Sequence, residues 1–420
     1  MNPRRGQRHP DPAAPVRVVL AGGGTGGHIY PALAVAEALR RLEPQIRLLY
    51  IGTRQGLESR LVPAAGLDLV HVAASGYRGL GPVARARFAA NLVLGVLQSL
   101  AALRRFRPDV VLGSGGFVSL PVGLAARALR CPLALQEQNA IPGSTNRLLG
   151  RWARRVYLGF AEAAPYFPAG RGRDTGNPVR AAFAGALQEG PRAADGEGRP
   201  AGTDGVCHVL VFGGSRGART LNRAVVDAAR GAWATRTDLS LWAQTGAGEH
   251  EAVARSCVGR LGATRITPYI DDMPAALRWA DVVVCRAGAM TLAELAAAGC
   301  AAVLVPYPHA TDQHQLRNAK SREDAGAALL LLDELCTGES LAACVDGLRR
   351  DPARLRAMAS AARRAARPDA AMEIAADLMR LAGRLPAGAE GPAPRSAGNK
   401  ELPCSATPAT STSSPSAASA

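Results

Sequence analysis

Short apolar runs alternate, along the first half of the chain, with longer stretches in which apolar residues recur every three or four positions. The short runs are rich in valine, leucine and isoleucine, as buried strands are, and the longer stretches fit amphipathic helices. The predicted strands of this half are Val16–Ala21, Ile46–Gly52, Asp68–Val72, Val110–Gly113, Leu133–Gln136 and Val156–Leu158. Regular alternation of strand and helix predicts a parallel, doubly wound sheet, with ligands bound beyond the carboxyl ends of its strands.

The same alternation starts again near Val206 and fills the second half. Its predicted strands are a run from Cys207, then Ser240–Gln244, Arg265–Pro268, Val282–Cys285, Ala302–Val305 and Ala328–Leu332. A chain of 420 residues is too long for one hydrophobic core, so we expect two α/β domains. The predicted domains are 16–178 and 179–368, with a solvent loop at 185–205. The lead 1–15 and the tail 386–420 are predicted to lack structure, because they have too few apolar residues to bury.

The first predicted strand runs directly into a glycine-rich turn. Gly22 to Gly27 hold five glycines around one threonine, and a helical pattern follows. Glycine lets the backbone turn sharply and approach a ligand, and free N–H groups at a helix start favour negative charge. The turn therefore predicts a phosphate or oxyanion site, with His28 at its mouth as a candidate acid or base. The alternative is a dinucleotide-binding domain in which His28 merely starts a helix, but the acidic residue expected about 20 residues on is missing near Gly52 and Thr53.

Composition narrows the choice of partners. The formal net charge is +16, and lysine occurs only at Lys320 and Lys400, so arginine supplies nearly all of the positive charge. Such a balance suits phosphates, anionic lipid or nucleic acid. Only 4% of the residues are aromatic and no basic stretch is interleaved with them, which makes nucleic acid a minor candidate. The eight cysteines show no metal-ligand spacing, and Cys131, Cys207, Cys285 and Cys300 are expected to be buried thiols of a reducing cytoplasm.

No apolar run reaches the length of about 18 residues that a membrane span needs. The nearest is Phe88 to Leu103, which Asn91 and Gln98 interrupt, and we expect a buried amphipathic helix there. Apolar residues from Tyr77 to Val96 are also mixed with arginines, a composition that suits a basic, apolar surface resting on anionic lipid. A core helix flanked by solvated arginines is the alternative.

A second candidate site follows the strand that ends at Cys285. Small residues form a turn, and a helix starts near Met290 with Thr291 and Glu294 in its first turns. The Thr291 hydroxyl lies beside free N–H groups that suit a diphosphate, and Glu294 lies on the same face, where it can accept hydrogen bonds from ribose hydroxyls. The alternative is that the two residues only cap the helix.

The stretch from 284 to 318 and the loop Gly22–His28 together resemble family 28 of the glycosyltransferases, whose members include enzymes that add N-acetylglucosamine to the lipid-linked peptidoglycan precursor. The resemblance implies the GT-B fold, an α/β architecture of two Rossmann-like domains facing across a cleft. It also implies that the last helix, about 369–385, packs back onto the first domain. The acceptor would meet the first domain and the UDP-sugar the second.

The resemblance also implies the residues of the site. His28 is the candidate catalytic base, and the alternative is that it positions phosphate as a cation. The substrate-binding residues are Thr25, Gly26, Gly27, Asn139, Arg180, Ser215, Ile270, Ala289, Met290, Thr291, Leu292, Ala293, Glu294 and Gln315. The glycine loop and Asn139 would face the lipid acceptor. The other residues would hold the donor: 289–291, Arg180 and Ser215 at the phosphates, Ile270 at uracil through its backbone, Glu294 at the ribose, and Gln315 at the sugar hydroxyls. Two positions depart from the family pattern, since Phe117 and Gln136 stand where tyrosine and histidine are frequent.

The resemblance therefore implies an inverting transfer of N-acetylglucosamine from its UDP donor to the 4-hydroxyl of N-acetylmuramic acid in lipid I, which gives lipid II. No cofactor or metal is expected, because the chain has no D-x-D pair. The expected partners are UDP-N-acetylglucosamine, lipid I and an anionic membrane surface on the cytoplasmic side, and other proteins of cell-wall synthesis and division are candidates that the residues do not identify. A UDP-sugar epimerase, a glycosyltransferase for another acceptor and a non-catalytic scaffold are the alternatives.

Overall fold

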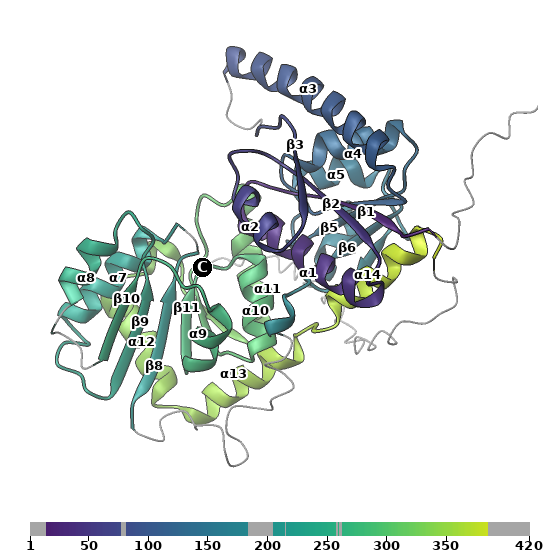
Figure 1. The fold of residues 1–420 in the computed structure, drawn as a ribbon. Helices are drawn as coiled ribbons and strands as arrows, with labels where there is room; N and C mark the ends of the chain where they lie inside the picture. Colours follow the sequence, from purple (N-terminus) through teal and green to yellow (C-terminus); the bar gives the residue numbers. More distant parts are fainter. Residues whose placement is uncertain are drawn as a thin grey trace, which may run out of the picture.

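Two parallel β-sheets, each covered by helices, form the two halves of the molecule (Figure 1). The computed structural model describes residues 14–76, 81–183, 205–214, 216–257, 259 and 263–384, without the side chains of residues 82, 84 and 311. The predicted tail, Ser215, and most of the predicted lead and of the loop at 185–205 lie outside the described residues. The prediction of two doubly wound α/β units is confirmed.

The first sheet has seven strands in the order β3-β2-β1-β4-β5-β6-β7. They are β1 (Arg17–Ala21), β2 (Arg47–Gly52), β3 (Asp68–His71), β4 (Val110–Gly113), β5 (Leu133–Glu137), β6 (Arg155–Leu158) and β7 (Gly172–Asp174). Every neighbouring pair is parallel, and the strand order reverses between β1 and β4. A ligand site is expected outside the carboxyl ends of strands at such a reversal, where the loops diverge.

The second sheet has six parallel strands in the order β10-β9-β8-β11-β12-β13. They are β8 (Cys207–Phe212), β9 (Leu239–Gln244), β10 (Ala263–Thr267), β11 (Val282–Cys285), β12 (Ala302–Leu304) and β13 (Ala328–Leu330). Its order reverses between β8 and β11. The ends of the predicted strands differ from the observed ones by one or two residues at most. The strand missing from the prediction is β7, a short edge strand without an apolar run.

Helices cover both sheets. In the first half they are α1 (Gly26–Leu42), α2 (Glu58–Ala64), α3 (Pro82–Phe106), α4 (Ser119–Ala128) and α5 (Ser144–Gly150), with the 3-10 helix η1 (Ala161–Tyr166). In the second half they are α7 (Arg219–Arg230), α8 (His250–Cys257), α9 (Met273–Trp279), α10 (Ala289–Ala298), α11 (His314–Asp324), α12 (Gly338–Arg349) and α13 (Pro352–Arg364), with η2 (Thr311–Gln313) and η3 (Asp333–Leu335). The last helix is α14 (Ala370–Leu381).

Helix α14 lies against α1 of the first half, although it follows the whole second half in sequence (Figure 1). Its residues Ile374 and Leu378 belong to the same buried cluster as Val18 of β1. Asp377, 4% exposed, accepts hydrogen bonds from Arg155 Nε at 3.1 Å and from the Tyr157 hydroxyl at 3.0 Å. Buried apolar area and a partnered carboxylate thus fix the end of the described chain to the first sheet.

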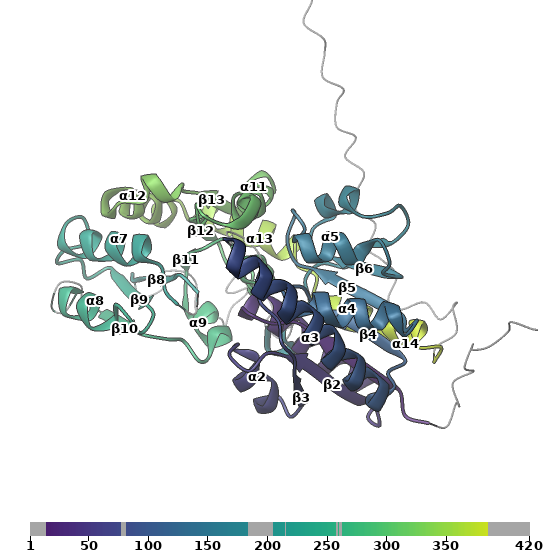
Figure 2. The same cartoon turned by 90° about the horizontal axis from the view of Figure 1, so that it is seen from above.

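Helix α3 packs on α4 along the outside of the first half, and the expectation of a buried helix there is wrong (Figures 1 and 2). Within the described residues, Arg85–Phe106 is the one window long and apolar enough to cross a membrane by length and composition, and only 17% of it is buried. Two of its polar residues face the protein beside Leu103, which is 1% exposed: Gln98 Oε1 accepts from Ala73 N at 2.6 Å, and Ser99 is fully buried. Other apolar residues face outward, with Val93 61% and Leu97 59% exposed.

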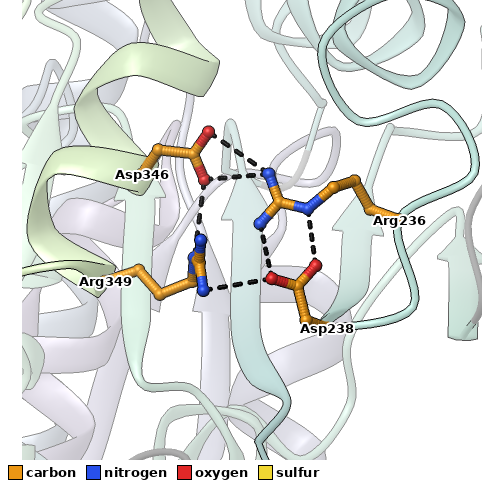
Figure 3. Close-up of polar contacts among 4 residues, drawn as sticks. All are labelled: Arg236, Asp238, Asp346 and Arg349. Atoms are coloured by element: carbon orange, nitrogen blue, oxygen red, sulfur yellow. Dashed lines mark hydrogen bonds and ion pairs between the residues drawn. The ribbon is translucent and has the colours of Figure 1, made fainter.

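A ring of alternating charges ties α12 to the segment before β9 (Figure 3). Arg236 contacts Asp238 through two nitrogens, at 2.5 and 2.9 Å, and Asp346 at 3.3 Å. Arg349 closes the ring on Asp238 at 3.0 Å and on Asp346 at 3.6 Å. Each charged group therefore has two neighbours of opposite charge. Surface ion pairs contribute most to folding stability when they form a network of this kind.

Candidate active site

Two glycine turns of the first half touch at the carboxyl ends of β1 and β4. Gly24 has a φ of +90° and Gly116 a φ of +74°, values that favour glycine. A Cβ atom on Gly116 would lie 2.5 Å from the backbone oxygen of Gly23. The close approach therefore requires glycine, and it brings the loop after β4 against the start of α1.

A buried carboxylate holds the first of these turns. Glu58 of α2 is fully buried and accepts hydrogen bonds from Gly24 N at 3.3 Å, Thr53 N at 2.9 Å and Thr53 Oγ1 at 2.7 Å. The contact joins the β1 turn to the end of β2. Nothing local in the sequence marks Glu58 for this position, because the residues that it binds lie on two other loops.

His28 lies in the first turn of α1 with its Nδ1 atom pointing at carbonyl oxygens. Nδ1 is 3.0 Å from the Ser114 oxygen and 3.2 Å from Gln138 Oε1. Since both partners are acceptors, Nδ1 carries the proton and Nε2 keeps a free lone pair. Burial lowers the pKa of His28 below its usual 6.5. The ring is therefore neutral near pH 7, the form that a general base requires.

A chain of side-chain amides continues from His28 to the connection between the halves. Gln138 Nε2 donates to the Ser114 oxygen at 2.6 Å and to Gln136 Oε1. Gln136 Nε2 donates to Asn177 Oδ1 at 2.8 Å, and Asn177 Nδ2 donates back to the Gln138 oxygen at 2.9 Å. All three amides are buried, so the network fixes the orientation of Gln138 Oε1 toward the histidine.

The loop after β5 is shaped by Glu137 and reaches the second half. Glu137, 1% exposed, accepts from Asn139 N at 2.9 Å and from Asn146 Nδ2 at 2.9 Å, and burial raises its pKa. Asn318 of α11 then bridges the halves: it donates to Asn139 Oδ1 at 3.2 Å and accepts from Ala140 N at 3.1 Å. Asn139 therefore lies at the junction of the two halves, and Asn318 is a contact that the sequence motifs did not reveal.

The N-terminus of α10 lies opposite α1, with which it is in contact. Its cap, Gly288, is extended, and no side chain caps the helix, so the first N–H groups are free for an anion. Burial raises the pKa of Glu294 to about 7, and the charge of Arg180 acts in the opposite sense. Leu292 instead packs in the core at 2% exposed, and Ala293 lines a cavity on another side of the helix.

Arg180 stands beside this helix with part of its guanidinium unsatisfied. Its guanidinium carbon lies 5.0 Å from the Tyr30 ring and 5.1 Å from the Phe183 ring. Its Nε atom is buried without a hydrogen-bond partner. Burial and a hydrogen bond with Tyr269 raise the pKa of Tyr30 to about 12, so Tyr30 remains a neutral wall of the site. A half-buried guanidinium with an unsatisfied N–H group is suited to an anionic ligand.

The remaining predicted donor residues of the second half are Ile270, in the segment before α9, and Gln315, in the first turn of α11. Ile270 is 5% exposed, and its backbone forms no hydrogen bond with any other described residue. Gln315 Oε1 accepts from Tyr307 N at 2.9 Å. In the first half, Thr25 caps α1 through its backbone only, and Gly26 and Gly27 form the first turn beside it. In the ranges that the structure describes, no three His, Cys, Asp or Glu side chains are grouped as metal ligands.

Comparisons with known proteins agree with this geometry. The glycosyltransferase family 28 N-terminal domain model matches residues 18–158, and the C-terminal domain model matches residues 208–374. A relative from Geobacter sulfurreducens is 41% identical over 87% of this chain and 98% of its own. One from Anaeromyxobacter dehalogenans is 42% identical over 88% and 94%. Both are named UDP-N-acetylglucosamine--N-acetylmuramyl-(pentapeptide) pyrophosphoryl-undecaprenol N-acetylglucosamine transferase. The crystal structure of Acinetobacter baumannii MurG superposes with a TM-score of 0.68 at 32% identity, covering 87% of this chain and 99% of that one.

Proposed function

The chain belongs to glycosyltransferase family 28, and on that premise we infer that it transfers N-acetylglucosamine from UDP-N-acetylglucosamine to lipid I, forming lipid II. The relatives that bear this activity in their names match the chain across both halves, so the inference covers the donor side and the acceptor side together. The structural observation that carries the chemistry is His28 of α1, the helix that contacts α10, because its Nδ1 is held by the Ser114 oxygen.

We propose that His28 is the general base. Its Nε2 lone pair takes the proton of the muramyl 4-hydroxyl as that oxygen bonds to the anomeric carbon of N-acetylglucosamine. The bond from this carbon to the diphosphate oxygen breaks on the opposite face, UDP leaves with the electron pair, and the configuration inverts. Thr25, Gly26, Gly27 and Asn139 support this role as the acceptor-facing groups around the histidine.

The donor is held on the second half. Free N–H groups at Ala289, Met290 and Thr291 and the guanidinium of Arg180 stabilise the negative charge that develops on the leaving diphosphate. Glu294 accepts the ribose hydroxyls, and the unpaired backbone of Ile270 suits the edge of uracil. Gln315 turns from Tyr307 N to the sugar hydroxyls. Leu292 acts from the core by holding α10 in place.

The exposed side of α3 supports attachment to a membrane surface. Val83 is 84% exposed, Leu94 is 47% exposed, and Arg85 and Arg87 lie beside them. An apolar stripe with flanking arginines suits an anionic bilayer on which the helix lies, and the lipid acceptor is held in such a bilayer. The seven described cysteines form no disulfide with one another, which fits the cytoplasmic face.

The test is transfer of radiolabelled N-acetylglucosamine from the UDP donor to a lipid I analogue, with and without a chelator. Wild-type protein is expected to form the lipid-linked disaccharide in chelator, and His28→Ala to be slower by roughly a hundredfold or more while UDP binding persists. His71→Ala, at the exposed end of β3, is the matched control. Loss of UDP-N-acetylglucosamine without any acceptor, or no product from a folded protein that binds UDP, would overturn the assignment.

A further inference from the structure

The cavity that Ala293 lines, which we call the hinge pocket, lies between the two halves. Its volume is about 230 Å³, and both connections between the halves line it: the segment after β7 and the segment between α13 and α14. Its walls also include η1 of the first half and α10 and α11 of the second. The charged and hydroxyl groups on its lining are Glu162, Asp174, Ser321, Arg322, Arg364 and Arg367.

Arg322 is the central cation of the hinge pocket. Its guanidinium carbon lies 5.1 Å from the Phe160 ring, which fixes the plane of the group, and its Nε atom is buried without a hydrogen-bond partner. Burial lowers the pKa of Arg322, and the charges that act on it are Glu162, Arg367 and Asp174. Within the described part of the chain Arg322 forms no ion pair with either carboxylate. Such a group gains most from a ligand that supplies acceptor oxygens.

Two features hold the pocket open across the hinge. The Ser321 hydroxyl donates to Glu162 Oε1 at 3.0 Å, so one carboxylate is engaged in joining the halves. Gly176 has a φ of +74°, and a Cβ atom there would lie 2.4 Å from Cγ of Arg367. The glycine therefore lets the Arg367 stem lie directly on the hinge, while Ala293, Ala296 and Ala297 of α10 leave room in front of it.

We propose that the hinge pocket binds a small phosphate-bearing molecule through Arg322, Arg364 and Arg367, and that its occupancy changes the affinity of the cleft for UDP. Three guanidinium groups against two carboxylates leave an excess of positive charge that favours an anion, and guanidinium matches phosphate geometry with paired N–H donors. The volume is below the roughly 300–1,000 Å³ of sites for drug-sized ligands, so the occupant is smaller than a nucleotide sugar. Because the occupant touches both halves and both connections, it stabilises one arrangement of the domains.

The test titrates glucose 6-phosphate, inorganic phosphate and glucose into protein saturated with UDP, so that the diphosphate site is already filled. Calorimetry should show binding of a phosphate compound at one site and no heat of binding for glucose. Comparison of glucose 6-phosphate with inorganic phosphate shows whether the site takes a phosphomonoester or the free anion. Arg322→Gln and Arg367→Gln should each weaken binding by roughly tenfold or more, and Arg356→Gln, an exposed residue of α13 outside the pocket, should not.

Coupling to the cleft is measured by the affinity for UDP with and without the bound phosphate compound. A change of about threefold or more in the wild type that disappears in Arg367→Gln supports it. Absence of binding to UDP-saturated protein, or binding that both arginine variants retain, would overturn the site. Binding without any change in UDP affinity would overturn the coupling alone. Neither readout requires transfer activity, so these failures are distinct from failure of the proposed function.

Discussion

His28 Nδ1 and the Ser114 carbonyl oxygen lie 3.0 Å apart, and this contact decides which nitrogen of the ring carries the proton. A carbonyl accepts only from N–H, so the free lone pair is on Nε2. Burial lowers the pKa of the ring below 6.5. As the pH falls through that lowered value, His28 gains a proton and loses its capacity as a base. We therefore expect kcat/KM to fall on the acid side with a midpoint below pH 6.5, measured with a water-soluble acceptor. A midpoint at 6.5 or above would contradict this tautomer and environment.

The residue opposite Nδ1 gives a sharper test. Gln138→Glu places a carboxylate near the ring in nearly the same volume, and a nearby negative charge favours the imidazolium. The acid limb of the rate profile should therefore move to higher pH, while UDP affinity stays close to that of the wild type. Gln138→Ala, which removes the acceptor without adding charge, should slow the reaction by about tenfold without that upward shift. Equal profiles for both variants would show that Gln138 does not position His28; thermal melting checks that both fold.

Glu294 predicts a pH dependence of donor binding. Burial raises its pKa to about 7 in the free protein, and in the proposed donor complex the ribose hydroxyls donate to the ionised carboxylate. UDP binding should thus release a proton near and below pH 7, and affinity should fall by up to about tenfold per pH unit on the acid side. Calorimetry in buffers of different ionisation enthalpy measures the release. Glu294→Gln should abolish this proton release, and Glu339→Gln, at an exposed position of α12, should not. Proton release that persists in Glu294→Gln would show that another group gives up the proton.

The outward side of α3 predicts how the protein meets a bilayer. Replacing Leu94 and Leu97 together by glutamate adds negative charge to the apolar stripe and should reduce sedimentation with anionic phospholipid vesicles by roughly tenfold or more. Transfer to a water-soluble acceptor should be retained, because neither side chain lies at the cleft. Leu335→Glu, equally exposed on the second half, is the control. Unchanged vesicle binding by the double variant would exclude α3 as the contact.

The ring of charges in Figure 3 predicts a contribution to stability that acid removes. The hydrogen bond from Arg236 lowers the pKa of Asp238 below 3.8, so its contribution is present above that value and is lost as the pH falls through the lowered one. Because Asp238 is 38% exposed, Arg236→Gln should cost only about 1 kcal/mol in urea unfolding at pH 7. The difference should shrink toward pH 3. Arg255→Gln, which breaks an exposed pair with Glu251, should change little at either pH.

Most strands could be predicted from the sequence because they are short runs of buried apolar residues, as Val110–Gly113 and Val282–Cys285 are. The short strand β7 could not, since its residues Gly172 to Asp174 are at the sheet edge and carry no apolar pattern. The orientation of α3 was equally hidden. Periodicity marks the apolar positions of a helix, but only the fold decides which of them meet the core. Here Gln98 and Ser99 share the inner side with Leu103, while Leu94 and Leu97 are exposed.

The candidate site shows the same division. Glycine turns and helix starts are local patterns, so His28, Thr291 and Glu294 could be located from the residues around them. Gln138, Glu58 and Asn318 form their hydrogen bonds with residues that are distant in sequence, so no local spacing of residues could predict these contacts. Asn318, for example, binds residues 178 and 179 positions away.

The place of α14 has a consequence for how the protein is made. The ribosome synthesises β1 to β7 long before Ile374, Asp377 and Leu378. Until those residues are made, one side of α1 stays uncovered, and Arg155 and Tyr157 lack their partner Asp377. During translation the first domain is therefore an incomplete folding unit with exposed apolar surface. Its final packing comes only after the second domain has emerged, and a chain truncated before residue 370 would remain in that exposed state.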